Sequence, residues 1–259
     1  MTGPARCSFS AALLLYGLAR VAAADTDSKA PGSAAPMSFA QMASLMQMDD
    51  RARIGKIQLD ELEWRDTSDG GAVVWEGYGF YGGDYDKLFV RSEGERASGD
   101  TRNARVELFW DHIIARWWDL QAGAREDFGG GPTRTWAALG LMGLAPYGFE
   151  TEITLYAGDG GRIAARLRTE VDLLLTQRLV LQPEIESNIY GQPDRARRVG
   201  AGCSDVDIGM RLRYEVRREL APYVGIAWTQ WSAQTARLLH PLTVRRGEAQ
   251  FVAGLRVWL

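Results

Sequence analysis

Residues 162–190 read RIAARLRTEVDLLLTQRLVLQPEIESNIY, and this stretch decides the fold. From Ile163 to Leu173 every second residue is mostly apolar, while the residues between them are mostly charged. The same alternation returns from Leu179 to Tyr190 and again over residues 205–216, DVDIGMRLRYEV. A period of two residues is typical of β-strands whose two faces meet different surroundings.

The length and polarity of these strands predict where they lie. Each run covers about 10 to 13 residues, roughly twice the usual strand of a globular protein. About 9–11 residues are needed for a tilted strand to cross a bilayer. One face is aliphatic and the other is charged, which is the reverse of a soluble sheet built around an apolar core. The pattern therefore predicts a transmembrane β-barrel with a polar lumen.

The composition of the whole chain agrees with a barrel. The 259 residues allow one large domain or two small ones, and the net charge of −3 gives no reason to expect a nucleic-acid partner. A mean hydropathy of −0.21 resembles that of a soluble protein, but alternation hides the apolar half of each strand from any average. Beyond the N-terminus no apolar run is long enough for a transmembrane helix.

The N-terminal part of the chain divides into two segments before the barrel. Residues 1–24 carry Arg6, an apolar stretch over 8–18 and three small residues ending at Ala24, the pattern of a secretory signal peptide. Residues 25–53 lack strand alternation and contain prolines, which predicts a flexible Met-containing arm in the periplasm. Residues 54–259 are predicted to form the barrel. Cys7 leaves with the signal peptide, so Cys203 is expected to be a surface thiol without a disulfide partner.

The predicted fold is an all-β, antiparallel, up-and-down transmembrane barrel of about 12 strands. From Glu126 onward the connections between strands differ in length, as expected when short periplasmic turns alternate with longer outer loops. An even number of strands places both termini, and with them the arm, in the periplasm. The candidate strands cover 54–64, 73–81, 87–95, 102–110, 116–125, 135–144, 148–156, 163–173, 179–190, 205–216, 222–231 and 249–259.

Several stretches of the chain resemble the copper resistance protein B family of outer-membrane proteins. They span most of the barrel and are residues 107–118 (ELFWDHIIARWW), 133–146 (TRTWAALGLMGLAP), 173–191 (LLLTQRLVLQPEIESNIYG), 204–223 (SDVDIGMRLRYEVRRELAPY) and 251–258 (FVAGLRVW). The resemblance implies a location in the outer membrane of a Gram-negative cell, binding of copper as Cu(I) or Cu(II), and a role in copper resistance or homeostasis. It also implies outer-membrane lipid, copper ions and periplasmic copper-handling proteins as partners. Family members usually carry a longer arm that is dense in Met and His, whereas the arm of this chain contains four Met and no His.

Two groups of residues are candidate copper ligands. The arm contains Met37, Met42, Met46 and Met48, and soft thioether sulfurs select Cu(I). The plain alternative is a short amphipathic or disordered segment with chance methionines. In the barrel, Glu184 and Glu186 share the predicted lumen face with arginines of neighbouring strands. This face is either a salt-bridged wall or a path for cations.

An enzyme is not predicted. His112 is expected in a tight turn and His240 in a long loop, and neither belongs to a Gly-x-Ser-x-Gly or HExxH motif. Two alternatives remain open at this point: a barrel hydrolase of lipids or esters with its site at the rim, and a soluble β-barrel binder. For a transmembrane barrel, Leu167, Leu181 and Leu212 are expected to point outward.

Overall fold

The computed structural model describes residues 38–46, 53–68, 70–239 and 245–259 of the chain. The chain separates into two compact units, Met1–Arg51 and Ala52–Leu259. The predicted signal peptide, most of the arm and His240 lie outside the described residues.

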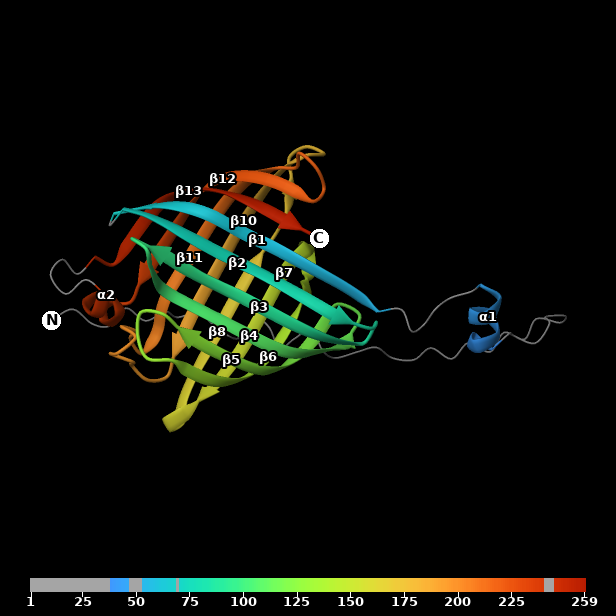
Figure 1. Cartoon of the computed structure of the whole chain (residues 1–259), viewed down its shortest axis with the longest axis horizontal. Helices are drawn as coiled ribbons and strands as arrows, with labels where there is room; N and C mark the ends of the chain where they lie inside the picture. Colours follow the sequence, from blue (N-terminus) through green and yellow to red (C-terminus); the bar gives the residue numbers. More distant parts are fainter. Residues whose placement is uncertain (1–37, 47–52, 69, 240–244) are drawn as a thin grey trace. The chain divides into compact units, whose positions relative to one another are not determined.

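The larger unit is one antiparallel sheet that closes on itself (Figure 1). Closure occurs where β1 pairs with β13 as well as with β2, and the backbone of Ile57 exchanges two hydrogen bonds with that of Leu259. All remaining pairings join strands that follow one another along the chain, so the connections run up and down. The strands are β1 (Ile54–Thr67), β2 (Gly70–Gly82), β3 (Asp86–Ala97), β4 (Asp100–Ala115), β5 (Trp118–Phe128), β6 (Arg134–Ala145), β7 (Phe149–Gly158), β8 (Arg162–Glu170), β9 (Leu173–Leu174), β10 (Leu179–Tyr190), β11 (Gly202–Tyr214), β12 (Leu220–Trp231) and β13 (Gly247–Trp258).

β8 and β9 are two parts of a single barrel strand, because both pair with β10. The described residues therefore form a barrel of 12 strands, as the sequence predicted. Pro183 on β10 lies opposite the interruption, where Val171 still donates a hydrogen bond to the Pro183 carbonyl. Proline has no N–H group to return that bond, so the regular ladder breaks at this position.

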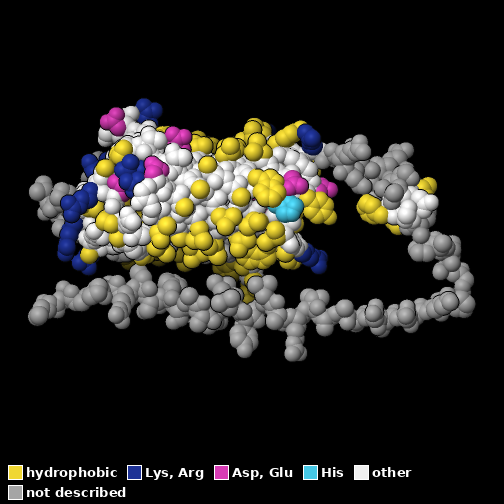
Figure 2. Space-filling view, turned by 90° about the horizontal axis from the view of Figure 1, so that it is seen from below, with side chains coloured by type: hydrophobic (Ala, Val, Ile, Leu, Met, Phe, Trp, Pro, Cys, Tyr) yellow, Lys and Arg dark blue, Asp and Glu magenta, His cyan; other side chains and the backbone are white. Residues whose placement is uncertain are grey.

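The outer surface of the barrel is apolar between its two ends. Leu167 and Leu212 are 44% and 36% exposed, and Leu181 pairs directly with Leu212 on the same face. Figure 2 shows apolar side chains over the middle of the barrel surface and charged side chains mainly toward its ends. The expected outward orientation of the three leucines agrees with this surface.

A β-bulge explains why the first strand has an imperfect alternation. The register of β1 shifts between Leu59 and Glu61 on one side and between Leu59 and Leu62 on the other. One extra residue, Asp60, lies in the strand at this point. Because an extra residue reverses the alternation, Gln58 before the bulge and Glu61 after it both face inward and are buried.

The two ends of the barrel differ in the length of their connections. The start of β1 and the C-terminus lie at the end with short connections, where residues 83–85 and 116–117 link neighbouring strands. The opposite end carries the longer segments 191–201 and 232–246, the second of which contains the helix α2 (Ala233–Leu239) (Figure 1). Among the described residues, no helix combines the length and the apolar character that crossing a membrane requires.

The smaller unit contains one described helix, α1 (Phe39–Leu45). It begins with a capping box, in which the Ser38 hydroxyl accepts a hydrogen bond from the Gln41 backbone and the Gln41 side chain accepts one from the Ser38 backbone. Met42 and Met46 are four residues apart and both exposed, so they lie on the same side of the helix.

Candidate functional site

The lumen of the barrel is filled by side chains of two kinds. Aromatic residues pack together on one part of the wall, with Phe89, Phe109, Trp136 and Tyr156 buried in a single cluster. Charged residues occupy the middle of the lumen. They come from alternate positions of the same strands, because inward-facing and outward-facing residues alternate along each strand.

The charged residues form one connected network, which we name the charged septum. Every member is a glutamate or an arginine, and each is joined to the rest by ion pairs of 4.0 Å or less. The members are Glu61, Glu63, Arg65, Glu76, Arg91, Glu93, Arg105, Glu107, Glu152, Arg166, Arg168, Glu170, Glu184, Glu186 and Arg211.

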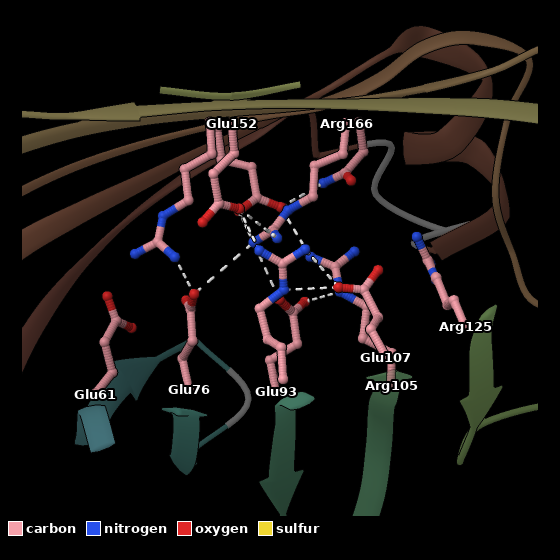
Figure 3. Close-up of polar contacts among 12 residues, drawn as sticks. Glu61, Glu76, Glu93, Arg105, Glu107, Arg125, Glu152 and Arg166 are labelled. Atoms are coloured by element: carbon pink, nitrogen blue, oxygen red, sulfur yellow. Dashed lines mark hydrogen bonds and ion pairs between the residues drawn. The ribbon is translucent and has the colours of Figure 1, made fainter. Parts of the chain in front are cut away.

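The septum crosses the lumen from wall to wall. Figure 3 shows Glu152 and Arg166 reaching from one side toward Glu76 and Glu93 on the other. The Nη2 atom of Arg166 lies 2.6 Å from Glu186 and 3.0 Å from Glu93. A planar guanidinium offers five N–H donors, so one arginine joins carboxylates from several strands at once.

Water is largely excluded from the septum. Arg166 is 1% exposed and Glu107 is fully buried. Glu107 accepts hydrogen bonds from Arg91 and from the Tyr156 hydroxyl, both at 2.6 Å. Buried charges persist in a low-dielectric interior only when they are paired in this way.

Two cavities lie on either side of the septum. The loop-side cavity, toward the longer connections, has a volume of about 610 Å³ and is lined by Glu184, Glu186 and Arg211 among others. The turn-side cavity, toward the short turns, has a volume of about 330 Å³ and is lined by Arg91, Glu152 and Arg168 among others. Glu76 borders both. The septum therefore lies between the two cavities.

Three carboxylates of the septum converge on one point. Glu61, Glu76 and Glu184 each present an oxygen within 4.8 Å of the other two. Arg211 lies 2.5 Å from Glu61 and 2.6 Å from Glu184, and Arg168 pairs with Glu184 and Glu76. Glu61 also pairs with Arg65, and Glu76 with Arg166, so four guanidinium groups surround the three carboxylates and each of them also pairs with further glutamates.

The predicted barrel ligands lie within this network. Glu184 belongs to the converging group, whereas Glu186 is held by Arg166 at 2.6 Å and by Arg105 at 3.2 Å. The expected salt-bridged wall is therefore present, as a layer of ion pairs across the lumen.

The predicted arm ligands are only partly within the described residues. Met42 and Met46 lie on α1 with exposed side chains, and Met37 and Met48 lie outside the described residues.

Several members of the septum were not predicted from the sequence as candidate site residues. Glu61, Glu76, Glu93, Glu107 and Glu152 stand at inward positions of strands that were recognised as strands. Their alternation was a usable signal. Their convergence with Glu184 depends on closure of the sheet, which brings β1 and β2 near β10.

His112 does not lie in a turn, so that expectation was wrong. β4 continues to Ala115, and His112 pairs in register with Asp86 on β3 and with Leu120 on β5. Its ring stacks on Trp110 and its Nδ1 lies 2.9 Å from Asp86. Trp110 is half exposed on the outer surface, so His112 lies with it near the rim and not in either cavity.

Cys203 is half-buried on β11, with its sulfur 3.5 Å from the Ser187 hydroxyl.

Asp194 fixes the long connection between β10 and β11 at the loop-side rim. Its carboxylate accepts a hydrogen bond from Arg134 Nε at 2.9 Å and two from backbone N–H groups of its own loop. Partial burial favours the neutral acid, but the hydrogen bond and the positive charge of Arg134 outweigh it and lower the pKa of Asp194.

Comparison with known proteins identifies close relatives. The family model described as copper resistance protein B precursor (CopB) matches residues 53–259. A copper resistance protein B from Escherichia coli is 45% identical over 202 residues, which cover 78% of this chain and 68% of the relative. A copper resistance protein B homolog from Pseudomonas syringae pv. tomato is 44% identical over 212 residues, covering 82% of this chain and 72% of the relative.

Solved structures agree on the fold. The NanC porin superposes with a TM-score of 0.52 at 13% sequence identity, over 79% of this chain and 99% of the porin. At this level of identity the likeness concerns the barrel architecture only.

Proposed function

The chain belongs to the copper resistance protein B family and serves copper resistance in the outer membrane; from this premise we propose that it binds copper ions at the charged septum and on its N-terminal arm. The plain outer-membrane role follows from the relatives and the barrel. The binding sites and their residues are the proposal.

The observation that carries the proposal is the charge of the septum. Nine glutamates are joined to only six arginines. A network that only had to fill the lumen would be expected to balance its charges, because an uncompensated buried carboxylate is costly. The carboxylates in excess of the arginines each need a proton or a cation, and a narrow, low-dielectric passage lined by carboxylates attracts a cation.

The converging oxygens of Glu61, Glu76 and Glu184 are the proposed septum site. Carboxylate oxygens are suitable ligands for Cu(II), the harder of the two copper ions. For copper to bind there, Arg168 would move toward its other partner Glu170, and Arg211 toward Glu63. Glu186 stands next to Glu184 on the lumen face of β10 and is proposed as a supporting ligand when Arg166 moves.

The arm is proposed to bind Cu(I) in the periplasm. Met42 and Met46 lie on one side of α1 with both thioethers exposed, and Met37 and Met48 extend the same set in the sequence. Thioether sulfur prefers Cu(I) over harder cations. Periplasmic copper-handling proteins are proposed as partners of this segment, and lipid covers the outer surface of the barrel.

Passage of copper through the barrel would need the septum to rearrange. Arg166 and its partners fill the lumen between the two cavities and leave Arg166 almost fully buried. We therefore propose a binding protein whose lumen opens by movement of guanidinium groups, not a permanently open pore.

The test is copper binding and copper resistance of matched glutamate variants. Glu76→Gln and Glu184→Gln remove charge from the proposed site, and Glu95→Gln makes the same change in the loop-side cavity outside the septum. We expect the first two to lower copper bound per purified barrel and growth of a complemented deletion strain in copper, and the third to leave both near wild type. Heat-modifiable gel migration confirms folding. Equal copper binding by all three variants would contradict the septum site.

The hydrolase and soluble-binder alternatives are not favoured. Family membership and the porin-like barrel point to a non-enzymatic protein. His112, one of the two histidines in the chain, contacts Asp86 and Trp110 at the outer surface.

A further inference from the structure

Asp111 is a buried carboxylate whose charge is not compensated by an ion pair. It lies on β4 at the turn-side end and is 1% exposed. Its Oδ2 atom accepts a hydrogen bond from Gln121 Nε2 at 3.0 Å, whereas no donor group bonds its Oδ1 atom and the Asp119 carboxyl lies within hydrogen-bonding reach. Among the described residues, no Lys or Arg forms an ion pair with it: Lys87, which faces it on β3, lies 3.8 Å from Asp119 instead. Such a group requires either a proton or a cation.

A soft donor lies beside this carboxylate. The sulfur of Met142 on β6 is 3.8 Å from the same Gln121 Nε2 atom that bonds Asp111. A thioether and a carboxylate oxygen therefore converge on one point, now held by the Gln121 amide. Gly140 faces Gln121 across the strand pair and carries no side chain, so the Gln121 amide oxygen and the Thr154 hydroxyl border the space that a side chain there would fill.

The position of Met142 distinguishes it from the other methionine of the barrel. The chain has seven methionines, of which only Met142 and Met210 follow the arm. Met210 points outward and is 52% exposed. Met142 points inward, lines the turn-side cavity together with Asp111 and Asp119, and pairs in register with Asp119.

We propose that Met142 and Asp111 bind one Cu(I) ion in the wall of the turn-side cavity, at the point that the Gln121 amide now holds. The sulfur supplies the preference for Cu(I), and the single carboxylate balances the single charge of the ion. Asp119 is the adjacent acidic group that attracts the cation into the cavity. This site rests on the proposed copper function and adds a place for copper on the periplasmic side of the septum.

The test measures Cu(I) affinity of the full mature chain in detergent against a colorimetric Cu(I) chelator. All variants are made in a background with Met37, Met42, Met46 and Met48 replaced by Leu, so that the arm does not contribute sulfur. Met142→Leu removes the proposed ligand, and Met210→Leu is the matched control. We expect Met142→Leu to weaken Cu(I) binding at least about tenfold, since even supporting groups of metal sites are worth that much, and Met210→Leu to have no effect.

Asp111→Asn is the second variant that tests the site. It should weaken Cu(I) binding as Met142→Leu does, and if it fails to fold, the conservative Met142→Leu variant decides alone. X-ray absorption should show a sulfur neighbour of copper that disappears in Met142→Leu and persists in Met210→Leu. Equal affinities of these two variants would overturn the site and leave Asp111 as a protonated structural residue. The proposed function would still stand if Glu76→Gln or the arm variant lowers copper binding, and both proposals fail if the wild-type chain binds no copper.

Discussion

Arg166 on β8 and Glu93 on β3 meet in the middle of the lumen, with Arg166 Nη2 3.0 Å from the Glu93 carboxylate. The two residues are 73 positions apart in the sequence and belong to strands that are separated by four others around the barrel. This contact joins nearly opposite walls, so the septum supports the barrel from inside.

Replacement of Arg166 by Ala should open and destabilise the barrel. Removal of one partner from a buried ion pair typically costs about 3–5 kcal/mol, because the remaining charge is left unpaired. We expect a lower stability toward denaturant and a higher single-channel conductance in a planar bilayer. Arg178→Ala, at an exposed arginine of a short turn, is the control and should change neither. An unaltered conductance in folded Arg166→Ala protein would show that the septum does not close the lumen.

Arginine on the outer surface should impair assembly in a depth-dependent manner. Leu167→Arg, Leu181→Arg and Leu212→Arg are each expected to cost about 2–4 kcal/mol if the side chain lies near the middle of the membrane. Ile54→Arg, at the exposed first residue of β1, should cost about 1 kcal/mol or less because it lies at the end of its strand, near the interface. Folding into lipid bilayers followed by gel migration measures the difference. Equal folding of all four variants would mean that the outward assignment is wrong.

Replacement of Met37, Met42, Met46 and Met48 by Leu should reduce copper binding without affecting the barrel. Leucine keeps the bulk and apolar character of methionine but has no sulfur to bind Cu(I). Copper bound per chain and growth in copper should both fall, and oxidation of the methionines to sulfoxides should have the same effect. Wild-type copper binding and resistance in the four-Leu protein would reduce the arm to a linker.

The long loop between β10 and β11 should loosen in acid. Arg134 lowers the pKa of Asp194 in the folded protein, so the contact stabilises the loop fully above the ordinary aspartate pKa of about 3.9. That stabilisation is lost as the pH falls through the lower, folded-state pKa. Hydrogen exchange of residues 191–201 should therefore rise at low pH. In Asp194→Asn the exchange should already be fast at neutral pH, whereas Asp84→Asn, in a turn at the opposite end, should behave as wild type.

The strands could be predicted from the sequence because the polarity of each residue matches the side of the sheet that it faces. Ile163, Leu167 and Leu212 are apolar because they face the outside, and Arg166, Glu184 and Arg211 are charged because they face the lumen. Period-2 alternation is a local property, so the strand count and the facing of side chains needed no knowledge of the tertiary structure. The bulge at Asp60 and the break opposite Pro183 disturb this local pattern, and they are the places where the predicted strands were least regular or continued too far.

The sites depended on closure of the barrel, which no local pattern contains. Glu61, Glu76 and Glu184 converge because β1 and β2 reach the neighbourhood of β10 only when the sheet is closed. Asp111 and Met142 come together because β4, β5 and β6 are in a particular register. The sequence by itself determined which face of each strand is wet and which is apolar. Only the tertiary structure decided which wet side chains meet, because register and closure arise from long-range backbone pairing and from the packing of the lumen.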